Sequence, residues 1–145
     1  MTRILTTDEF IDACRNAAFS ALVKRSRREP LALWMTCDGA FGTSTLVDVD
    51  SNLSEPELLS RVREKLLSDA EDEGWYAVSI ARLQSLVSLN DGFVRGDLLL
   101  EISDVRGHPS NVHLSFSRGG QAGVVWTTAR HEVGTLPKLT GMDRL

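Results

Sequence analysis

Residues 97–129, with the sequence DLLLEISDVRGHPSNVHLSFSRGGQAGVVWTTA, decide the fold. Apolar side chains occupy every second position in three short runs, which cover residues 98–102, 112–116 and 124–126. A period of two is typical of a strand that has one buried and one polar face. The segments between the runs contain glycine, serine and asparagine, which suit turns. The stretch therefore predicts an antiparallel meander of three strands.

Two segments outside the meander have the apolar spacing of amphipathic helices. Thr6 begins the first with a capping-box pattern, and Pro30 closes it. The apolar stripe of this helix is rich in alanine, which permits close approach to a sheet. Ser54 and Glu57 form a second capping box, and Gly74 marks where that helix stops.

The remaining segments predict further strands. Residues 31–37 and 43–49 suit a hairpin, because Gly39 and Gly42 lie in the loop between them. The first of these strands is apolar on both faces, so its second face needs a cover from a helix or a partner. Residues 75–81 also alternate as a strand. Residues 82–90 fit either a strand or a short helix, and their serine and valine content favours the strand.

Together these elements predict an α+β domain with the order α-β-β-α-β-(β)-β-β-β. We expect the two helices to pack on one face of a mostly antiparallel sheet of five to seven strands. A single domain is expected over residues 1–136, with 137–145 as a loosely attached tail unless its leucines dock on the sheet. The chain of 145 residues is long enough to bury about two-thirds of its unfolded surface.

The charge is unevenly distributed along the chain. The formal net charge is −4, whereas residues 48–73 alone contain nine acidic and three basic residues, a balance of −6. An acidic excess repels phosphate backbones, so we expect no nucleic-acid partner. No apolar run is long enough to cross a bilayer, and the first residues do not suit a signal peptide. We therefore expect a cytoplasmic protein, with Cys14 and Cys37 as reduced thiols.

Metal and cofactor motifs are incomplete. Residues 48–52 begin like a calcium loop, but Leu53 stands where the turn glycine belongs and Leu59 replaces the bidentate glutamate. Two cysteines alone do not make the usual four-ligand zinc set. The glycine-rich residues 118–123 lack the Lys-Ser/Thr ending of a phosphate loop. We expect no metal site and no cofactor.

Glu101 and His113 are the only candidates for catalysis. If the hairpin between their strands centres on Gly107, Glu101 lies opposite His113, and Thr127 continues the row on the next strand. A carboxylate that orients an imidazole is an arrangement used for general base catalysis. An exposed cross-strand ion pair explains the same row more simply, and no nucleophile motif accompanies it. An enzyme is therefore the less favoured class.

The sheet face opposite the expected core mixes apolar and polar side chains, as interaction surfaces do. It would carry Trp34, Leu99, Glu101, His113, Ser115, Val125 and Thr127. The second helix has acidic residues at its C-terminal end, where the helix dipole disfavours them. A solvated surface is the commoner explanation of such residues, and a docking patch is the alternative. The expected partner-binding residues are Trp34, Asp69, Glu71, Asp72 and His113.

These observations predict a non-catalytic protein-binding module whose partner is another protein or a second copy, as in a homodimer. Small acidic secretion chaperones and bacterial immunity proteins are similar in size, charge and fold class alone. The alternative is a small enzyme or ligand-binding domain with a pocket between the helices and the sheet.

Overall fold

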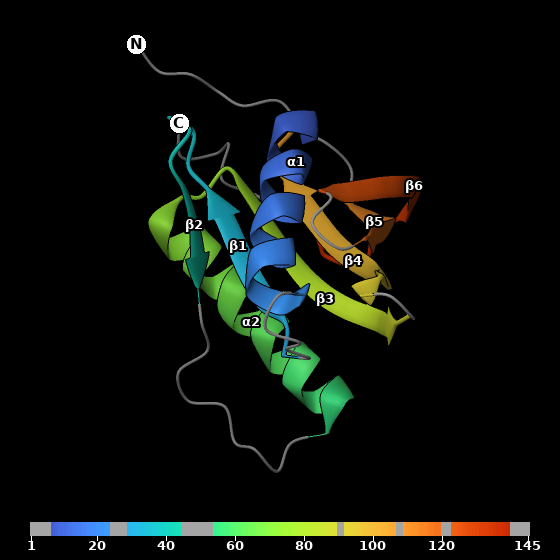
Figure 1. Ribbon diagram of the computed structural model, residues 1–145. Helices are drawn as coiled ribbons and strands as arrows, with labels where there is room; N and C mark the ends of the chain where they lie inside the picture. The colour runs from blue at the N-terminus through green and yellow to red at the C-terminus, as the bar shows by residue number, and fades with distance from the viewer. Residues whose placement is uncertain are drawn as a thin grey trace.

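A computed structural model describes residues 7–23, 29–44, 54–89, 92–106, 109–119 and 123–139. In these residues two helices and six strands follow one another in the order α-β-β-α-β-β-β-β (Figure 1). The predicted α+β class, with two helices against an antiparallel sheet, is confirmed. The calcium-like residues 48–52 lie outside the described part of the chain.

Helix α1 spans Thr7–Ala18 and continues into a π-helical turn, η1, at Phe19–Val23. One stripe of this segment is buried, as its spacing predicts, and it consists of Phe10, Cys14, Ala18, Phe19, Leu22 and Val23. The small side chains of this stripe let the helix approach the sheet closely. Thr6 and residues 24–28 lie outside the described part.

Helix α2 spans Glu55–Glu73 and has both predicted boundaries. The Ser54 hydroxyl accepts a hydrogen bond from the backbone N–H of Glu57 at 3.4 Å, which satisfies one of the free donors of the first turn. Gly74 adopts the left-handed conformation, with φ of 69°, and its N–H donates to the carbonyl of Ala70. The buried stripe consists of Leu59, Val62, Leu66 and Ala70.

The six strands form one antiparallel sheet with the order β2-β1-β3-β4-β5-β6. Their bounds are β1 Leu31–Met35, β2 Phe41–Ser44, β3 Ala77–Ser88, β4 Val94–Asp104, β5 Ser110–Arg118 and β6 Val124–Val133. The ambiguous residues 82–90 are strand as far as Ser88, because β3 continues through them and pairs with β4 along its length. Among the described residues, the edges of the sheet are β2 and β6.

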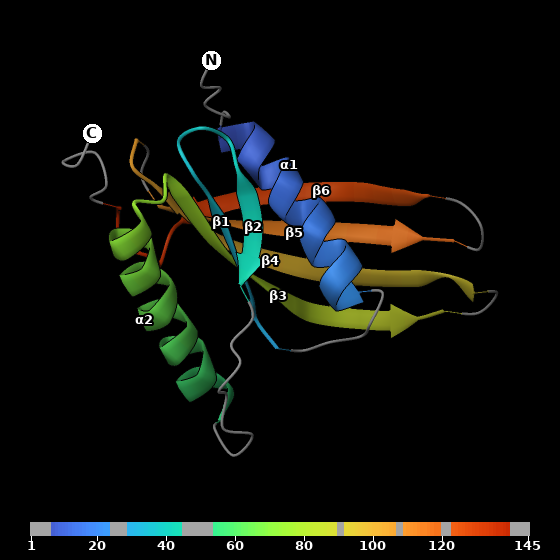
Figure 2. The ribbon, with the colours of Figure 1, turned by 90° about the vertical axis from the view of Figure 1, so that its left-hand side faces the viewer.

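The two helices lie on opposite faces of the sheet, so the expectation that both pack on one face is wrong. Figure 2 shows α1 and α2 on either side of β1. Phe19, which follows α1, packs against Phe116, and Arg63 of α2 binds Glu101. The β4–β5 ladder pairs Phe116 with Gly96, so these two residues lie on the same face of the sheet. Successive side chains along a strand point to opposite faces, and Glu101 is an odd number of residues from Gly96 on β4. Glu101 therefore projects from the face opposite Phe116. These faces are called the α1 face and the α2 face below.

The sequence contains the reason for this arrangement. Strands β1 and β3 are apolar on both sides, and Ala32, Val78 and Ile80 supply the side that α2 covers. A strand that is apolar on both faces needs a cover on each. The sheet is therefore enclosed by α1 on one side and α2 on the other where β1 and β3 lie.

The chain after β6 folds back over the α2 face. Leu136 and Leu139 belong to the core, and the Ser103 hydroxyl donates to the carbonyl of Pro137 at 2.6 Å. The packed structure thus continues to Leu139, beyond the expected boundary at 136, and residues 140–145 lie outside the described part. Residues 134–139 are called the C-terminal segment below.

Substitution of one buried leucine on each face tests this layering. Leu100, on the α1 face, and Leu66, on α2, are both at most 2% exposed. Leu100→Ala and Leu66→Ala should each lower the free energy of unfolding by about 2–5 kcal/mol, because each leaves a cavity. Since the sheet separates them, the double variant should show the sum within about 0.5 kcal/mol in urea unfolding. Leu89→Ala, at an exposed position, is the control, and a strong deviation from additivity would contradict the two-sided packing.

Candidate functional site

A buried carboxylate joins four parts of the chain on the α2 face. The side chain of Glu101 is 1% exposed, and its Oε1 accepts hydrogen bonds from Nε and Nη2 of Arg63 at 3.0 and 2.6 Å. The hydroxyl of Thr135 donates to the same oxygen. Arg82 on β3 brings its Nε to 3.9 Å from the other carboxylate oxygen. Glu101 therefore connects α2, β3, β4 and the C-terminal segment, and it is not accessible as a catalytic base.

The predicted row of Glu101, His113 and Thr127 does not form. In the β4–β5 ladder Glu101 lies opposite Asn111, and His113 lies opposite Leu99. The hairpin centres one residue before the predicted Gly107, which displaces the register by two residues. Its turn is stabilised by Asp104, whose Oδ1 accepts a hydrogen bond from the N–H of Arg106 at 2.9 Å. A displacement of two residues keeps every side chain on its predicted face but changes its neighbours.

His113 has a different carboxylate as its partner. Its Nε2 lies 3.0 Å from Oε2 of Glu132 on β6, and Oε1 of Glu132 lies 3.1 Å from Nη2 of Arg130. Thr127 occupies an irregularity in the β5–β6 register, and its hydroxyl donates to the carbonyl of Ser115 at 3.3 Å. The ladder pairs Phe116 with Trp126, two residues away from the register that would place Thr127 opposite His113, and the extra residue in β6 adds a third, so Arg130 lies opposite His113.

Asp97 forms a second polar centre on the α2 face, which the sequence did not indicate. The hydroxyls of Ser85 and Ser115 donate to its two carboxylate oxygens at 2.6 Å each. The Ser115 bond, followed by that from Ser85, holds the pKa of the Asp97 carboxyl below its usual range, against partial burial, which raises it. The sequence could have predicted this centre only if Ser85 had been assigned to a strand. The pattern of residues 82–90 fits either a strand or a short helix.

The predicted partner-binding residues are not brought together on one surface. Trp34 lies on β1, where its ring stacks on that of Trp75 with centroids 5.0 Å apart and planes 4° apart. The ring also covers Gly42, where a Cβ would come within 2.2 Å of it, so Trp34 is a packing residue. His113 lies on β5, with β3 and β4 between it and β1.

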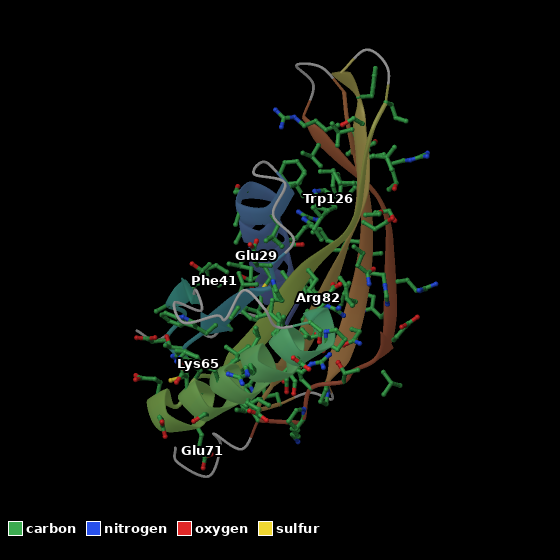
Figure 3. All side chains as sticks on the ribbon, turned by 90° about the horizontal axis from the view of Figure 1, so that it is seen from below. Glu29, Phe41, Lys65, Glu71, Arg82 and Trp126 are labelled. Carbon is green, nitrogen blue, oxygen red and sulfur yellow. The ribbon has the colours of Figure 1, made fainter. Side chains whose placement is uncertain are left out.

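The acidic residues of α2 form a separate group at the C-terminal end of that helix. Asp69 makes an ion pair with Lys65 one turn earlier, at 3.2 Å. Glu71 and Asp72 are exposed. Figure 3 shows Glu71 at the end of the molecule remote from Trp126.

Part of the α2 face has no helix over it. Helix α2 covers β1 and the first half of β3, and the C-terminal segment covers Glu101 and Ser103, whereas no described helix lies over the remaining half of β4–β6 (Figure 3). There the ladder aligns Val87, Arg95, Ser117 and Val125 across four strands. This open face is defined by Val87, Arg95, Asp97, His113, Ser115, Ser117 and Val125.

The α1 face contains a pocket of about 220 Å³ between η1 and the ends of β3, β4 and β5. Apolar side chains from Phe19, Val23, Leu86, Val94 and Phe116 line it, together with Ser88 and Arg118. Neither Glu101 nor His113 reaches it, because both project from the other face of the sheet. The pocket thus has a cation and a hydroxyl but no acid–base pair among its lining residues.

Cys14 lies on the buried side of α1, and this burial raises the pKa of its thiol well above the usual range. A protonated thiol is a poor nucleophile. Within the described ranges, no three His, Cys, Asp or Glu side chains are grouped to hold a metal ion. No helix in the same ranges is long and apolar enough to cross a membrane.

Comparison with protein-family models, with curated proteins and with solved structures finds no match.

Removal of the principal partner of Glu101 should destabilise the fold strongly. Arg63→Met leaves a buried carboxylate with one less donor group, and we expect a loss of about 3 kcal/mol in the free energy of unfolding. Lys65→Met, on the exposed side of the same helix, is the matched control and should cost less than about 0.5 kcal/mol. Equal costs in chemical denaturation would show that Glu101 does not depend on Arg63.

The Asp97 carboxylate should make the stability of the protein depend on pH. A pKa that is lower in the folded state contributes stability above the unfolded value of about 4, and this contribution is lost as the pH falls through the folded value. The wild type should therefore exceed Asp97→Asn in free energy of unfolding at neutral pH, and the difference should shrink as the solution is acidified. Urea unfolding across this pH range measures it, and a difference independent of pH would contradict the assignment.

Proposed function

We propose that the chain is a non-catalytic protein-binding module and that the open face is its docking surface. The single observation that supports this most is the row across β3–β6, where Val87 and Val125 are 48% and 58% exposed at its two ends. Arg95, also exposed, lies between them, next to the Ser85–Asp97–Ser115 hydrogen bonds. Exposed apolar groups beside fixed polar groups are the composition of a contact surface.

The rigidity of this surface also supports docking. The Asp97 carboxylate fixes hydroxyls from β3 and β5 in place, so the strands that carry Val87 and Ser117 have little freedom to rearrange. A surface that is already ordered loses less conformational entropy when a partner binds. An ordered sheet face fits a partner that presents an apolar ridge flanked by hydrogen-bonding and acidic groups, the latter opposite Arg95.

The enzyme alternative has less support. Glu101 is buried under α2 and the C-terminal segment, and His113 is bound to Glu132. The pocket on the α1 face is reached by neither side chain. A general base, a nucleophile and a pocket are thus not combined in any one place in the part of the chain that the structure describes.

A photoreactive residue placed on the open face tests the proposal in the native cell. Val125→p-benzoylphenylalanine should give, on irradiation, a discrete covalent adduct whose mass differs from twice that of the chain. The same residue at Arg61, exposed on α2, is the matched control and should give no such adduct. Arg95→Glu should weaken the adduct at position 125 about tenfold, because it reverses a charge within the surface. The proposal fails if position 125 gives no adduct, or if Arg95→Glu leaves the adduct unchanged.

A further inference from the structure

Strand β6 is an edge strand with side chains exposed on both faces. Arg130 and Glu132 project from the α2 face, whereas Ala129, His131 and Val133 project from the α1 face, and Val133 is 92% exposed. The sheet order leaves the outer side of β6 without a neighbouring strand among the described residues. An edge of this kind can pair with another strand.

The hydrogen bonds to β5 show which peptide groups are available. The N–H of Gly134 donates to the carbonyl of Pro109 at 3.0 Å, so Gly134 faces β5. Because peptide groups alternate along an antiparallel strand, those of Glu132 and Arg130 also face β5, and those of Ala129, His131 and Val133 face outward. Three consecutive outward groups are thus free of the sheet's own ladder.

We propose that the occupant of this edge is a second copy of the chain, paired antiparallel through β6 about a two-fold axis at His131. In this register Ala129 lies opposite Val133 of the second copy, and His131 lies opposite its own copy. The three outward-facing residues of one chain then lie opposite the three of the second copy. Each of the three pairs exchanges two N–H···O=C bonds, which gives about six backbone hydrogen bonds. The pairing covers the exposed Val133 side chain with apolar surface.

Charge selects this register over its neighbours. With the axis at His131, Arg130 lies opposite Glu132 of the second copy, and this pairing occurs twice by symmetry. These residues form non-hydrogen-bonded pairs, in which opposing side chains approach most closely. An axis at Arg130 or at Glu132 would instead place that residue opposite its own copy, with like charges in contact.

The same edge is limited to a short contact. The irregularity at Thr127 interrupts β6, so the regular part available for pairing is confined to residues 128–133. A contact of this size is below that of a standard stable interface. We therefore expect a dimer that forms in the micromolar range or above and weakens with salt, because its selective contacts are exposed ion pairs. It uses the edge alone and leaves the open face uncovered.

Sedimentation velocity over a concentration series from micromolar to millimolar tests the proposal with the full chain. The wild type should pass from monomer to dimer, and Arg130→Glu and Glu132→Arg should each raise the dissociation constant about tenfold or more. An equimolar mixture of these two variants should associate at least as tightly as the wild type, since one chain then presents two acids and the other two bases. Recovery in the mixture also shows that both variants are folded.

Two further variants isolate the backbone contact and the surface involved. His131→Pro removes the N–H at the axis and should abolish the dimer, whereas His131→Thr keeps this N–H and should retain it. Arg95→Glu, on the open face, should leave the dimer unchanged. If the wild type is monomeric over the whole concentration series, the proposal is overturned, and a strand of another protein becomes the candidate occupant of the edge. Dimers that persist in both charge variants, a mixture that does not recover, or a dimer lost in Arg95→Glu would also overturn it.

Discussion

The burial of the Glu101 carboxylate is the constraint on which the α2 side of the structure depends. A charge without access to water requires donors or opposite charges close by. Arg63 on α2 and Thr135 after β6 supply the donors, and Arg82 on β3 supplies a second positive charge at 3.9 Å. Arg63 and Thr135 belong to parts of the chain that lie outside the strand ladders. The carboxylate therefore fixes the position of α2 along the sheet and the path of the chain after β6, whereas apolar packing supplies most of the free energy.

Local signals in the sequence predicted local structure well. The Ser54 hydroxyl and the left-handed Gly74 form the predicted caps of α2, and the period of two assigned Leu100 and Leu114 to the buried side of their strands. The sheet face on which each helix packs was harder to predict. Apolar residues that recur with a period of 3.6 show which side of a helix is buried, but not which face of the sheet covers that side. The apolar residues on both sides of β1 were the indication that two covers were needed.

The candidate site was harder to predict for a related reason. A shift of two residues in the strand register leaves each side chain on the same face of the sheet. Glu101 and His113 therefore share a face, as predicted, but they do not lie opposite each other. The shift depends on the turn before Pro109, where a hydrogen bond between Asp104 and Arg106 sets the hairpin centre. Burial of Glu101 depends further on Arg63 and Thr135, which are 38 and 34 residues away in sequence, and no local pattern specifies such a contact.

The two edges of the sheet differ in a way that governs how large an assembly can become. Strand β6 forms one edge and β2 forms the other, so the two edges carry different side chains. A head-to-tail array would require the edge formed by β6 in one molecule to fit the different edge formed by β2 in the next. The proposed association through β6 is instead isologous, so each contact would use the same surface that a further contact needs. A self-complementary β6 edge thus favours closed pairs over fibres, although the sheet has open ends.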